Sequence, residues 1–537
     1  MKRTWSLPLV CIMLVTLLVA CTPFASASEE IVDGRFVKTR SITVEIFDRG
    51  NPGGSKPEDN FYTDFIKEGM LRDHNVEVTF VPVPRWTEVE VLNNLLAAGD
   101  APDVCYTYSY PTIQTYANMG GVLDLSSYVD EYKDLLPNLW GFLGEDNIYW
   151  NKDPETGTIW AIEAKLFQNK RINTFVREDW LKKLGISEPT TLEEFEDMLR
   201  AFKENASLLL GDDADKVIPY ATSFDIGWRN NHLLVSFVPE SISDKDRYVY
   251  GFDDRHLMYP GIKEGVRKLN EWYNAGLIWK DFPLYGAGDS TEDNLIKAGY
   301  VGAFMHNWDY PFRGDEDSIH NNLKRLVGED ASYIAVECFK NDAGLYRKFL
   351  SAPVDRKVFF PASNKEPLAS LLYLDWITKL ENRRYLQIGE EGVTHQVQED
   401  GSIRILPATG DKIMNSPQNI DYTMTINGLD LGDPELTAKS IAFNYPGVEK
   451  RYVERAYQMT SNEARYGQNW NVGEIKAQEG MAQALKEKRD NLWIQAVVAK
   501  PDDFDTVYDR GYQDYLRSGG QAIIDERKAA FEKYYED

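Results

Sequence analysis

Near the front of the chain, apolar and polar residues alternate with the period of a β-strand. Within residues 41–47 every second position is apolar, and a glycine-rich loop follows at 48–54. A helix is predicted near 58–72 and a second strand over 76–81. Strand, helix and strand in this order form a βαβ unit, which predicts a parallel sheet with right-handed crossovers.

Two later strands are predicted to end in aromatic and polar side chains. Beyond a buried strand near 104, Tyr106 and Tyr108 alternate with smaller residues. Residues 300–308 form another predicted strand, whose end carries His306 and Trp308. Open parallel sheets place ligands outside the carboxyl ends of their strands, so these positions are candidates for a binding site.

The first 20 residues have the pattern of an export signal. Two basic residues precede a mostly apolar run that is too short to span a membrane as a helix. The run ends at residues 18–21 in Leu-Val-Ala-Cys, which resembles the bacterial lipobox and implies a lipidated Cys21 at the start of the mature chain. The alternative is a plain secretory signal cut after Ala25 or Ala27.

Size and charge narrow the class of protein. The chain has 537 residues, which is more than one hydrophobic core usually organises, so two or more lobes are expected. Its 59 Lys and Arg face 85 Asp and Glu, giving a formal net charge of −26. Because phosphate contacts need clustered positive charge, a nucleic-acid partner is not expected.

Cysteine and histidine spacing gives no support for a metal site. Outside the signal and its end only Cys105 and Cys338 remain, either as two buried free thiols or as one long-range disulfide. The six histidines show no HExxH or Cys-His spacing. No cofactor is therefore expected.

Several stretches in a fixed order resemble the bacterial extracellular solute-binding proteins of family 1, and specifically their larger lipoprotein branch. That family delivers sugars to ABC importers. The resemblance covers roughly residues 40–380 and implies an α/β fold of the two-lobed, periplasmic-binding-protein-like type (type II), with the ligand cleft between the lobes. The matching stretches are 95–104, 120–129, 175–202, 297–308 and 360–376.

The resemblance also implies a division of the chain. Crossings between lobes are expected near 163–168 and 350–357. The expected segments are a signal peptide at 1–20, a lipidated tether at 21–37, an N-terminal lobe from 38–165 and 352–425, and a C-terminal lobe from 166–351 and 426–537.

The function implied by the resemblance is capture rather than catalysis. A monomer, anchored by lipid on the extracytoplasmic face of the cell membrane, would bind a carbohydrate, expected to be an oligosaccharide, by hinge closure. It would then deliver this ligand to the permease subunits of an ABC transporter. The alternatives are a secreted polysaccharide-active enzyme and a binding protein for a non-sugar solute such as a peptide or metal.

Sugars need paired donors and acceptors for their hydroxyl groups and flat apolar partners for their C–H faces. Each candidate has an ordinary alternative role in sheet packing, the core or a solvated surface. The candidates are Arg49, Trp86, Tyr106 and Tyr108 from the first lobe, Glu163 beside the first crossing, and Trp228, His306 and Trp308 from the second lobe.

Some larger family members carry a calcium loop, and the corresponding stretch here is 211–219. Its carboxylates lie within Asp212–Asp215, but the glycine turn is missing and the ligand spacing is altered. Because a calcium shell of 6–8 oxygens needs a tightly turned backbone, an acidic surface loop without metal is expected.

Overall fold

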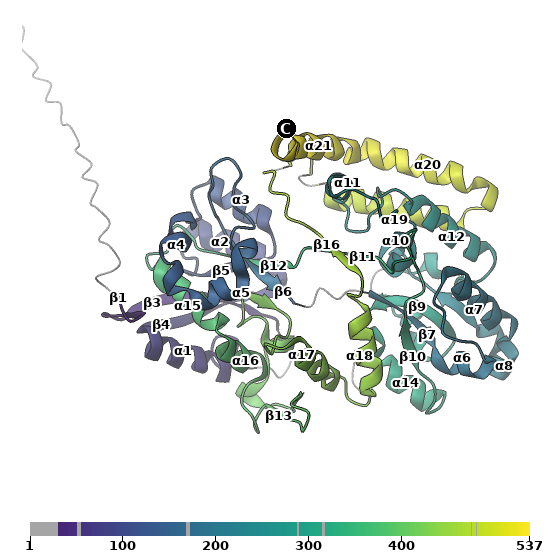
Figure 1. Cartoon of the computed structure of the whole chain (residues 1–537), viewed down its shortest axis with the longest axis horizontal. Helices are drawn as coiled ribbons and strands as arrows, with labels where there is room; N and C mark the ends of the chain where they lie inside the picture. The colour runs from purple at the N-terminus through teal and green to yellow at the C-terminus, as the bar shows by residue number, and fades with distance from the viewer. Residues whose placement is uncertain are drawn as a thin grey trace, which may run out of the picture.

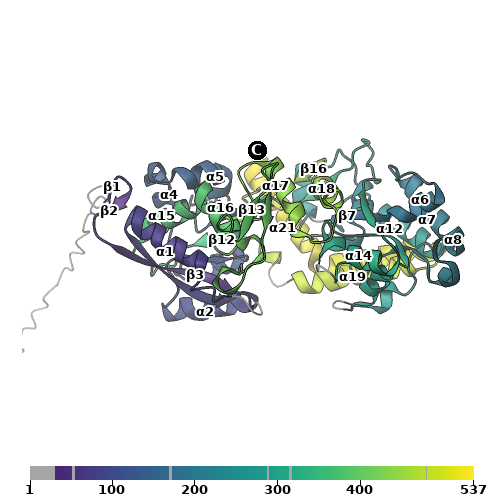
Figure 2. The same cartoon turned by 90° about the horizontal axis from the view of Figure 1, so that it is seen from below.

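A computed structural model describes residues 31–50, 55–167, 172–286, 289–313, 317–473, 475–478 and 481–536. Two α/β lobes lie side by side along the long axis of the molecule, and both views show the same arrangement (Figures 1 and 2). The predicted signal, the lipidation site Cys21 and most of the tether lie outside the described residues.

The first lobe begins with the predicted βαβ unit. Strands β3 (Arg40–Asp48) and β4 (Val76–Pro84) pair in parallel, and helix α1 (Phe61–His74) connects them along the chain. Asn60 caps α1 through its side chain, which accepts hydrogen bonds from the backbone of the first turn. Strand β5 (Cys105–Thr107) then runs parallel to β3 through the Val44–Val104 bridge. This part of the sequence prediction is confirmed.

A four-stranded sheet completes the first lobe, in the order β15 (Ile426–Asn427), β6 (Ile162–Leu166), β12 (Val354–Phe359) and β5. Strand β12 is antiparallel to both neighbours, so the lobe is mixed rather than purely parallel. The covering helices are α2 (Glu88–Ala98), α3 (Tyr110–Asn118), α4 (Ser126–Glu131), α5 (Pro137–Ile148), α15 (Pro367–Thr378) and α16 (Leu380–Ile388).

The second lobe holds a sheet in the order β10 (Tyr333–Val336), β7 (Ile172–Arg177), β9 (Val301–Asn307) and β8 (Ile218–Ala221). Only β8 and β9 are parallel. Its helices up to residue 326 are α6 (Glu178–Leu184), α7 (Leu192–Glu204), α8 (Ala206–Leu210), α9 (Ile226–Arg229), α10 (Asn231–Ser236), α11 (Asp244–Tyr250), α12 (Ile262–Asn274), α13 (Thr291–Lys297) and α14 (Ile319–Leu326).

One edge of each sheet faces the chain connection from β6 to β7, as the directions of the strands show. Strand β6 ends at Leu166 and runs parallel to β5 and β3, so the carboxyl ends of all three lie at that edge. In the second lobe Ile172, at the start of β7, pairs with Asn307 at the end of β9. The carboxyl ends of β8 and β9 therefore face the same crossing.

The apolar core is divided, as the chain length predicts. One buried cluster packs around β3, β4, β5 and α15, and a larger one packs around the β7–β9 sheet. Ile388 and Ile403, which the expected division assigns to the first lobe, pack with the larger cluster. Helix α17 (Pro434–Ile441) packs against the 403–405 strand and links the two segments.

The chain ends in helices that lie on the second lobe and reach the first. Helices α18 (Lys450–Met459), α19 (Ala482–Val498), α20 (Phe504–Tyr515) and α21 (Gln521–Tyr535) follow one another, and α21 ends beside the first lobe (Figure 1). There Lys533 forms an ion pair with Glu155 at 2.6 Å, and the Tyr534 hydroxyl donates to the same carboxylate at 2.8 Å. Asn469 also donates to the backbone carbonyl of Trp150 in the first lobe, so several contacts besides the chain crossings join the two lobes.

Candidate functional site

An arginine with two aromatic rings marks the carboxyl ends of β4 and β5. The Arg85 guanidinium lies 4.3 Å from the Tyr108 ring centroid and 5.4 Å from that of Trp86. Glu88 holds Arg85 by an ion pair of 2.7 Å. Trp86 is 77% exposed, so it offers a flat apolar face at the edge directed toward the second lobe.

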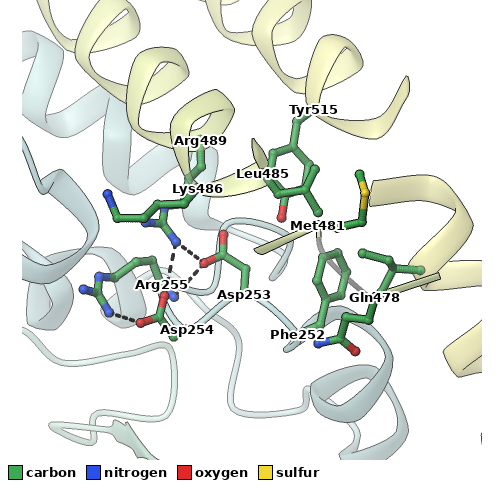
Figure 3. A pocket seen from close by; sticks show the side chains of 11 residues that line it. Phe252, Asp253, Asp254, Arg255, Gln478, Met481, Leu485, Lys486, Arg489 and Tyr515 are labelled. Carbon is green, nitrogen blue, oxygen red and sulfur yellow. Dashed lines mark hydrogen bonds and ion pairs between the residues drawn. The ribbon is translucent and has the colours of Figure 1, made fainter. Parts of the chain in front are cut away.

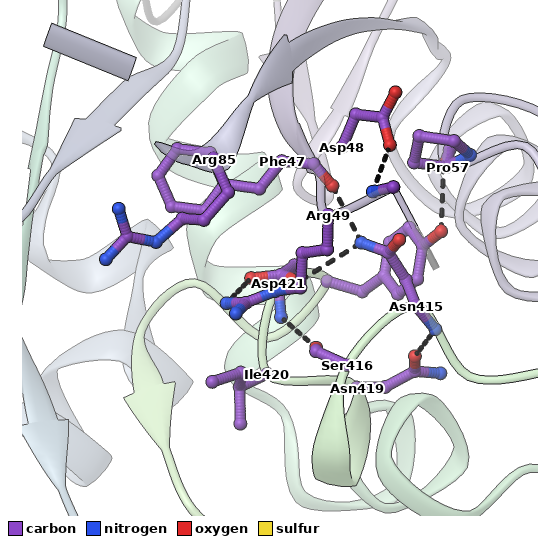
Figure 4. Close-up of polar contacts among 12 residues, drawn as sticks. Phe47, Asp48, Arg49, Pro57, Arg85, Asn415, Ser416, Asn419, Ile420 and Asp421 are labelled. Carbon is purple, nitrogen blue, oxygen red and sulfur yellow. Dashed lines mark hydrogen bonds and ion pairs between the residues drawn. The ribbon is translucent and has the colours of Figure 1, made fainter. Parts of the chain in front are cut away.

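Arg49, which follows the end of β3, forms an ion pair with a buried carboxylate. Its Nε and Nη2 donate to the two oxygens of Asp421 at 2.7 and 2.8 Å, and Asn415 donates to the same carboxylate at 3.0 Å (Figure 4). Asp421 is fully buried. The arginine thus fastens the loop after β3 to the 415–421 segment, with two donors already used.

Tyr106 does not line the cleft, which corrects its selection as a stacking residue. Its ring is fully buried and packs 4.3 Å from the Phe47 ring centroid. Its hydroxyl accepts a hydrogen bond from the Phe47 backbone N–H at 3.1 Å. Tyr106 therefore belongs to the core of the first lobe, whereas Tyr108, one ring further out, is only partly buried.

Glu163 lies on β6 just before the crossing and is almost fully buried. Asn151 donates to its Oε1 at 2.6 Å, Lys357 lies 3.6 Å from Oε2, and Oε2 accepts no hydrogen bond. Burial raises the pKa of Glu163 to about 7, against the opposing attraction of Lys357. A buried acceptor with one unused oxygen can receive a hydroxyl when the surrounding segments move.

This raised pKa predicts a pH-dependent loss of stability. A group whose pKa is higher in the folded chain favours folding at low pH, and that contribution is lost as pH rises from about 4.5 to about 7. The loss is about 3 kcal/mol, since one pKa unit corresponds to about 1.36 kcal/mol.

Glu163→Gln should abolish that slope, because the amide does not titrate. The unfolding midpoint of the wild type and of the variant, followed by circular dichroism from pH 4.5 to 8, checks it. Glu77→Gln, at an exposed position, is the matched control and should keep the wild-type slope. Parallel profiles for wild type and Glu163→Gln would contradict the assignment.

An aromatic cavity of about 240 Å³ opens at the carboxyl ends of β8 and β9. Strand β8 leads into the 223–225 loop and α9, which line one side of it. His306 comes from the end of β9, and residues of 279–286 and 289–293 line the other side. We call it the aromatic cavity. Its lining consists of Ser223, Phe224, Asp225, Trp228, Arg229, Trp279, Phe282, Tyr285, Gly286, Asp289, Glu292, Asp293, His306 and Tyr310.

Stacked rings give this cavity flat walls. The rings of Trp279 and Tyr285 are nearly parallel, with centroids 5.2 Å apart. His306 and Tyr310 stack with centroids 3.4 Å apart. The Trp228 ring carries the Arg255 guanidinium 4.9 Å from its centroid. Flat apolar rings with carboxylates between them are the combination that a sugar ring requires.

His306 contributes a neutral imidazole. Burial, together with the charge of Arg229, lowers the pKa of His306 to about 2, so the ring is uncharged at neutral pH. Its Nδ1 accepts from the Asn307 backbone N–H at 2.7 Å, which leaves the proton on Nε2. His306 thus supplies a hydrogen-bond donor without a charge.

Trp308 lies in the core, contrary to its selection as a stacking residue. It is 6% exposed, and the rings of Tyr445 and Tyr457 meet it nearly edge-on at 5.9 and 5.3 Å. Strand β9 ends at Asn307, so the turn that follows directs the next side chain inward.

Sequence reasoning missed four of the residues that form these walls. Arg85 precedes a selected tryptophan, and Trp279 and Tyr285 belong to an aromatic run that ends at a glycine. That run was a usable signal for a loop with exposed rings. The role of Glu292 could not be recognised, because it depends on a two-pronged ion pair with the distant Arg229 at 2.6 and 2.5 Å.

The cysteines and the acidic loop carry no site in the described part of the chain. Cys105 and Cys338 are buried and free, so the disulfide alternative is wrong. Residues 211–216 form a 3-10 helix in which Asp213 pairs with Lys216 at 2.9 Å. Within the described ranges no group of three or more His, Cys, Asp or Glu residues could hold a metal ion, and no helix could cross a membrane.

Comparison with known proteins shows what the chain is similar to. The family described as bacterial extracellular solute-binding protein matches residues 53–229. The polygalacturonan/rhamnogalacturonan-binding protein YtcQ of Bacillus subtilis is 22% identical over 487 residues, which is 86% of each chain. These matches agree with the resemblance to solute-binding proteins that the sequence motifs carry.

A second relative is similar to this chain over a shorter stretch. The fructooligosaccharide ABC transporter substrate-binding protein FusA of Streptococcus pneumoniae is 27% identical over 201 residues. The match spans 35% of this chain and 36% of FusA.

Solved structures confirm the fold of the chain. FusA in complex with kestose covers 92% of this chain and 99% of its own, with a TM-score of 0.58 at 15% identity. The alginate-binding protein AlgQ2 without calcium covers 92% and 98%, with a TM-score of 0.56 at 18% identity. The expected two-lobed, periplasmic-binding-protein-like fold is thus observed.

Proposed function

We propose that this solute-binding protein captures an uncharged oligosaccharide between its lobes and delivers it, unchanged, to an ABC importer. The aromatic cavity carries the proposal, because its stacked rings and carboxylates lie at the edge that faces Arg85, Trp86 and Tyr108 of the other lobe. The names of FusA and YtcQ support a carbohydrate ligand. The polygalacturonan named for YtcQ is acidic, so the preference for an uncharged sugar rests on the charge pairing in this chain alone.

Capture proceeds by hinge closure. A ligand that contacts both walls favours the state in which the lobes approach, and the permease subunits recognise that state. In this proposal the lobes consist of residues 38–165 with 352–425 and of 166–351 with 426–537. The protein acts as a monomer, held on the extracytoplasmic face of the membrane by lipid on Cys21.

Charge pairing favours an uncharged sugar over an acidic one. The aromatic cavity is lined by four carboxylates and one guanidinium, that of Arg229, which Glu292 neutralises. In the first lobe Arg49 forms an ion pair with Asp421, and Arg85 forms one with Glu88. A uronate would therefore meet excess negative charge and no cation reserved for it, so its carboxylate would lose hydration without compensation.

A thermal-shift screen tests this proposal. Neutral malto-, galacto- and fructo-oligosaccharides are compared with oligogalacturonides of equal length. A ligand at about 100 times its Kd adds about 2.7 kcal/mol of stability, which raises the unfolding midpoint by several degrees. We expect stabilisation by at least one neutral series and none by oligogalacturonides. Stabilisation by the acidic series alone would overturn the charge argument, and no stabilisation by any sugar would overturn the proposed function.

A further inference from the structure

A second cavity of the second lobe lies under the C-terminal helices, and its lining shares no residue with that of the aromatic cavity. It measures about 330 Å³, within the range of small-molecule sites, and separates the 252–255 loop from α19, α20 and α21 (Figure 3). We call it the C-terminal cavity. Its lining consists of Phe252, Asp253, Asp254, Arg255, Gln478, Met481, Leu485, Lys486, Arg489, Tyr515 and Ile523.

A buried carboxylate in this cavity has an unused oxygen. Asp253 is 7% exposed, and its Oδ1 accepts from the Arg255 backbone N–H at 3.0 Å and from Arg489. Its Oδ2 is buried and accepts no hydrogen bond. A buried acceptor without a donor costs free energy, and a ligand hydroxyl would satisfy it.

The charges around the C-terminal cavity are already balanced. Arg489 pairs with Asp253, and Lys486 pairs with Asp490 at 2.8 Å. Asp254 is held by Arg255. A charged ligand would therefore disturb existing ion pairs, whereas an uncharged hydroxyl donor would not.

The rest of the lining suits an apolar ring face. Phe252 and Tyr515 have nearly parallel rings with centroids 6.5 Å apart, and Met481, Leu485 and Ile523 add aliphatic surface. An apolar face together with one hydroxyl donor describes a pyranose or furanose ring.

Arg255 connects the two cavities. It lines the C-terminal cavity, while its guanidinium lies over Trp228 and donates to both oxygens of Asp225, at 3.1 and 2.8 Å. Trp228 and Asp225 both line the aromatic cavity. Arg255 thus lies between the two cavities and contacts the lining of both.

We propose that the C-terminal cavity is a second saccharide subsite, which holds one uncharged ring of an oligosaccharide whose other rings occupy the aromatic cavity. This inference rests on the proposed function and extends it to ligand length. It predicts that affinity rises as rings are added, until the chain reaches Phe252 and the free oxygen of Asp253.

Calorimetric titration of the full chain with neutral malto-, galacto- and fructo-oligosaccharides of two to six rings tests the inference. In the wild type we expect the longer members of the binding series to bind at least 10-fold more tightly than the disaccharide. Phe252→Ala, which removes the ring, and Gln478→Trp, which fills the cavity, should each abolish that gain and leave disaccharide affinity within twofold. Phe443→Ala, at a partly exposed ring outside both cavities, should behave as wild type.

The outcomes separate the two proposals. If sugars bind but length brings no gain, or both variants keep the full gain, the second subsite is wrong and the proposed function stands. If no series binds at all, the proposed function fails and the subsite fails with it. Two variants are used because loss of Phe252 could unfold the loop, whereas Gln478→Trp adds volume without removing a contact ring.

Discussion

Replacing Trp228 with alanine should weaken saccharide binding by about 30-fold, which corresponds to about 2 kcal/mol. The ring lines the aromatic cavity and carries Arg255 on one face, so its loss removes stacking area and frees the guanidinium that orders the cavity wall. Calorimetric titration of wild type and variant with the same neutral oligosaccharide measures the change.

The control for this prediction is Trp140→Ala. Trp140 is a partly buried tryptophan of α5 that contacts Lys133 and does not line the aromatic cavity, so its replacement should leave affinity within twofold. Equal losses in the two variants would show a general effect of removing a tryptophan. An unchanged affinity in Trp228→Ala would remove the aromatic cavity from the binding site.

Arg49→Met should lower the free energy of unfolding by about 3 kcal/mol. The change removes the bidentate cation and leaves Asp421 fully buried, with Arg356 at 4.0 Å as its remaining cation. A buried carboxylate that has lost its main partner is strongly destabilising. Thermal unfolding by calorimetry or circular dichroism, with denaturant unfolding beside it, measures the loss. Asp421→Asn in the same chain should recover part of it, because the charge is then gone.

Arg72→Met offers a matched comparison. Arg72 makes the same two-pronged contact with Asp73, at 2.7 and 2.8 Å, but is 67% exposed. Exposed pairs contribute at most about 1 kcal/mol, so this variant should unfold near the wild-type midpoint. If both arginine variants lose the same stability, burial of Asp421 is not what makes Arg49 important.

Local pattern predicted the strands well, because alternation and turn residues within a short stretch determine them. The βαβ unit at 41–81 and the strand that ends near His306 are both present. The expected parallel sheets are mixed, because β7 and β12, each entered from a crossing, run against their neighbours. Strand direction after a crossing depends on the whole lobe and leaves no local signal.

Side-chain direction beyond a strand end was less predictable. The Trp308 side chain points into the core because the rings of Tyr445 and Tyr457 pack against it there. Both tyrosines lie more than 130 residues later in the chain. Arg49 is committed because Asp421 lies beside it, 372 residues away in sequence. The stacking rings Trp279 and Tyr285 depend on a loop whose position relative to β9 is set by tertiary packing. Such contacts between distant segments cannot be derived from local periodicity.

The central claim is that the cleft captures a saccharide without converting it. A single calorimetric titration of the full chain with a neutral oligosaccharide tests it directly. The ligand is afterwards recovered from the calorimeter's sample cell and analysed by chromatography. We predict saturable binding of one saccharide per chain and recovery of the intact ligand. Absence of binding heat across the neutral series, or recovery of shortened or modified sugar, would contradict the claim.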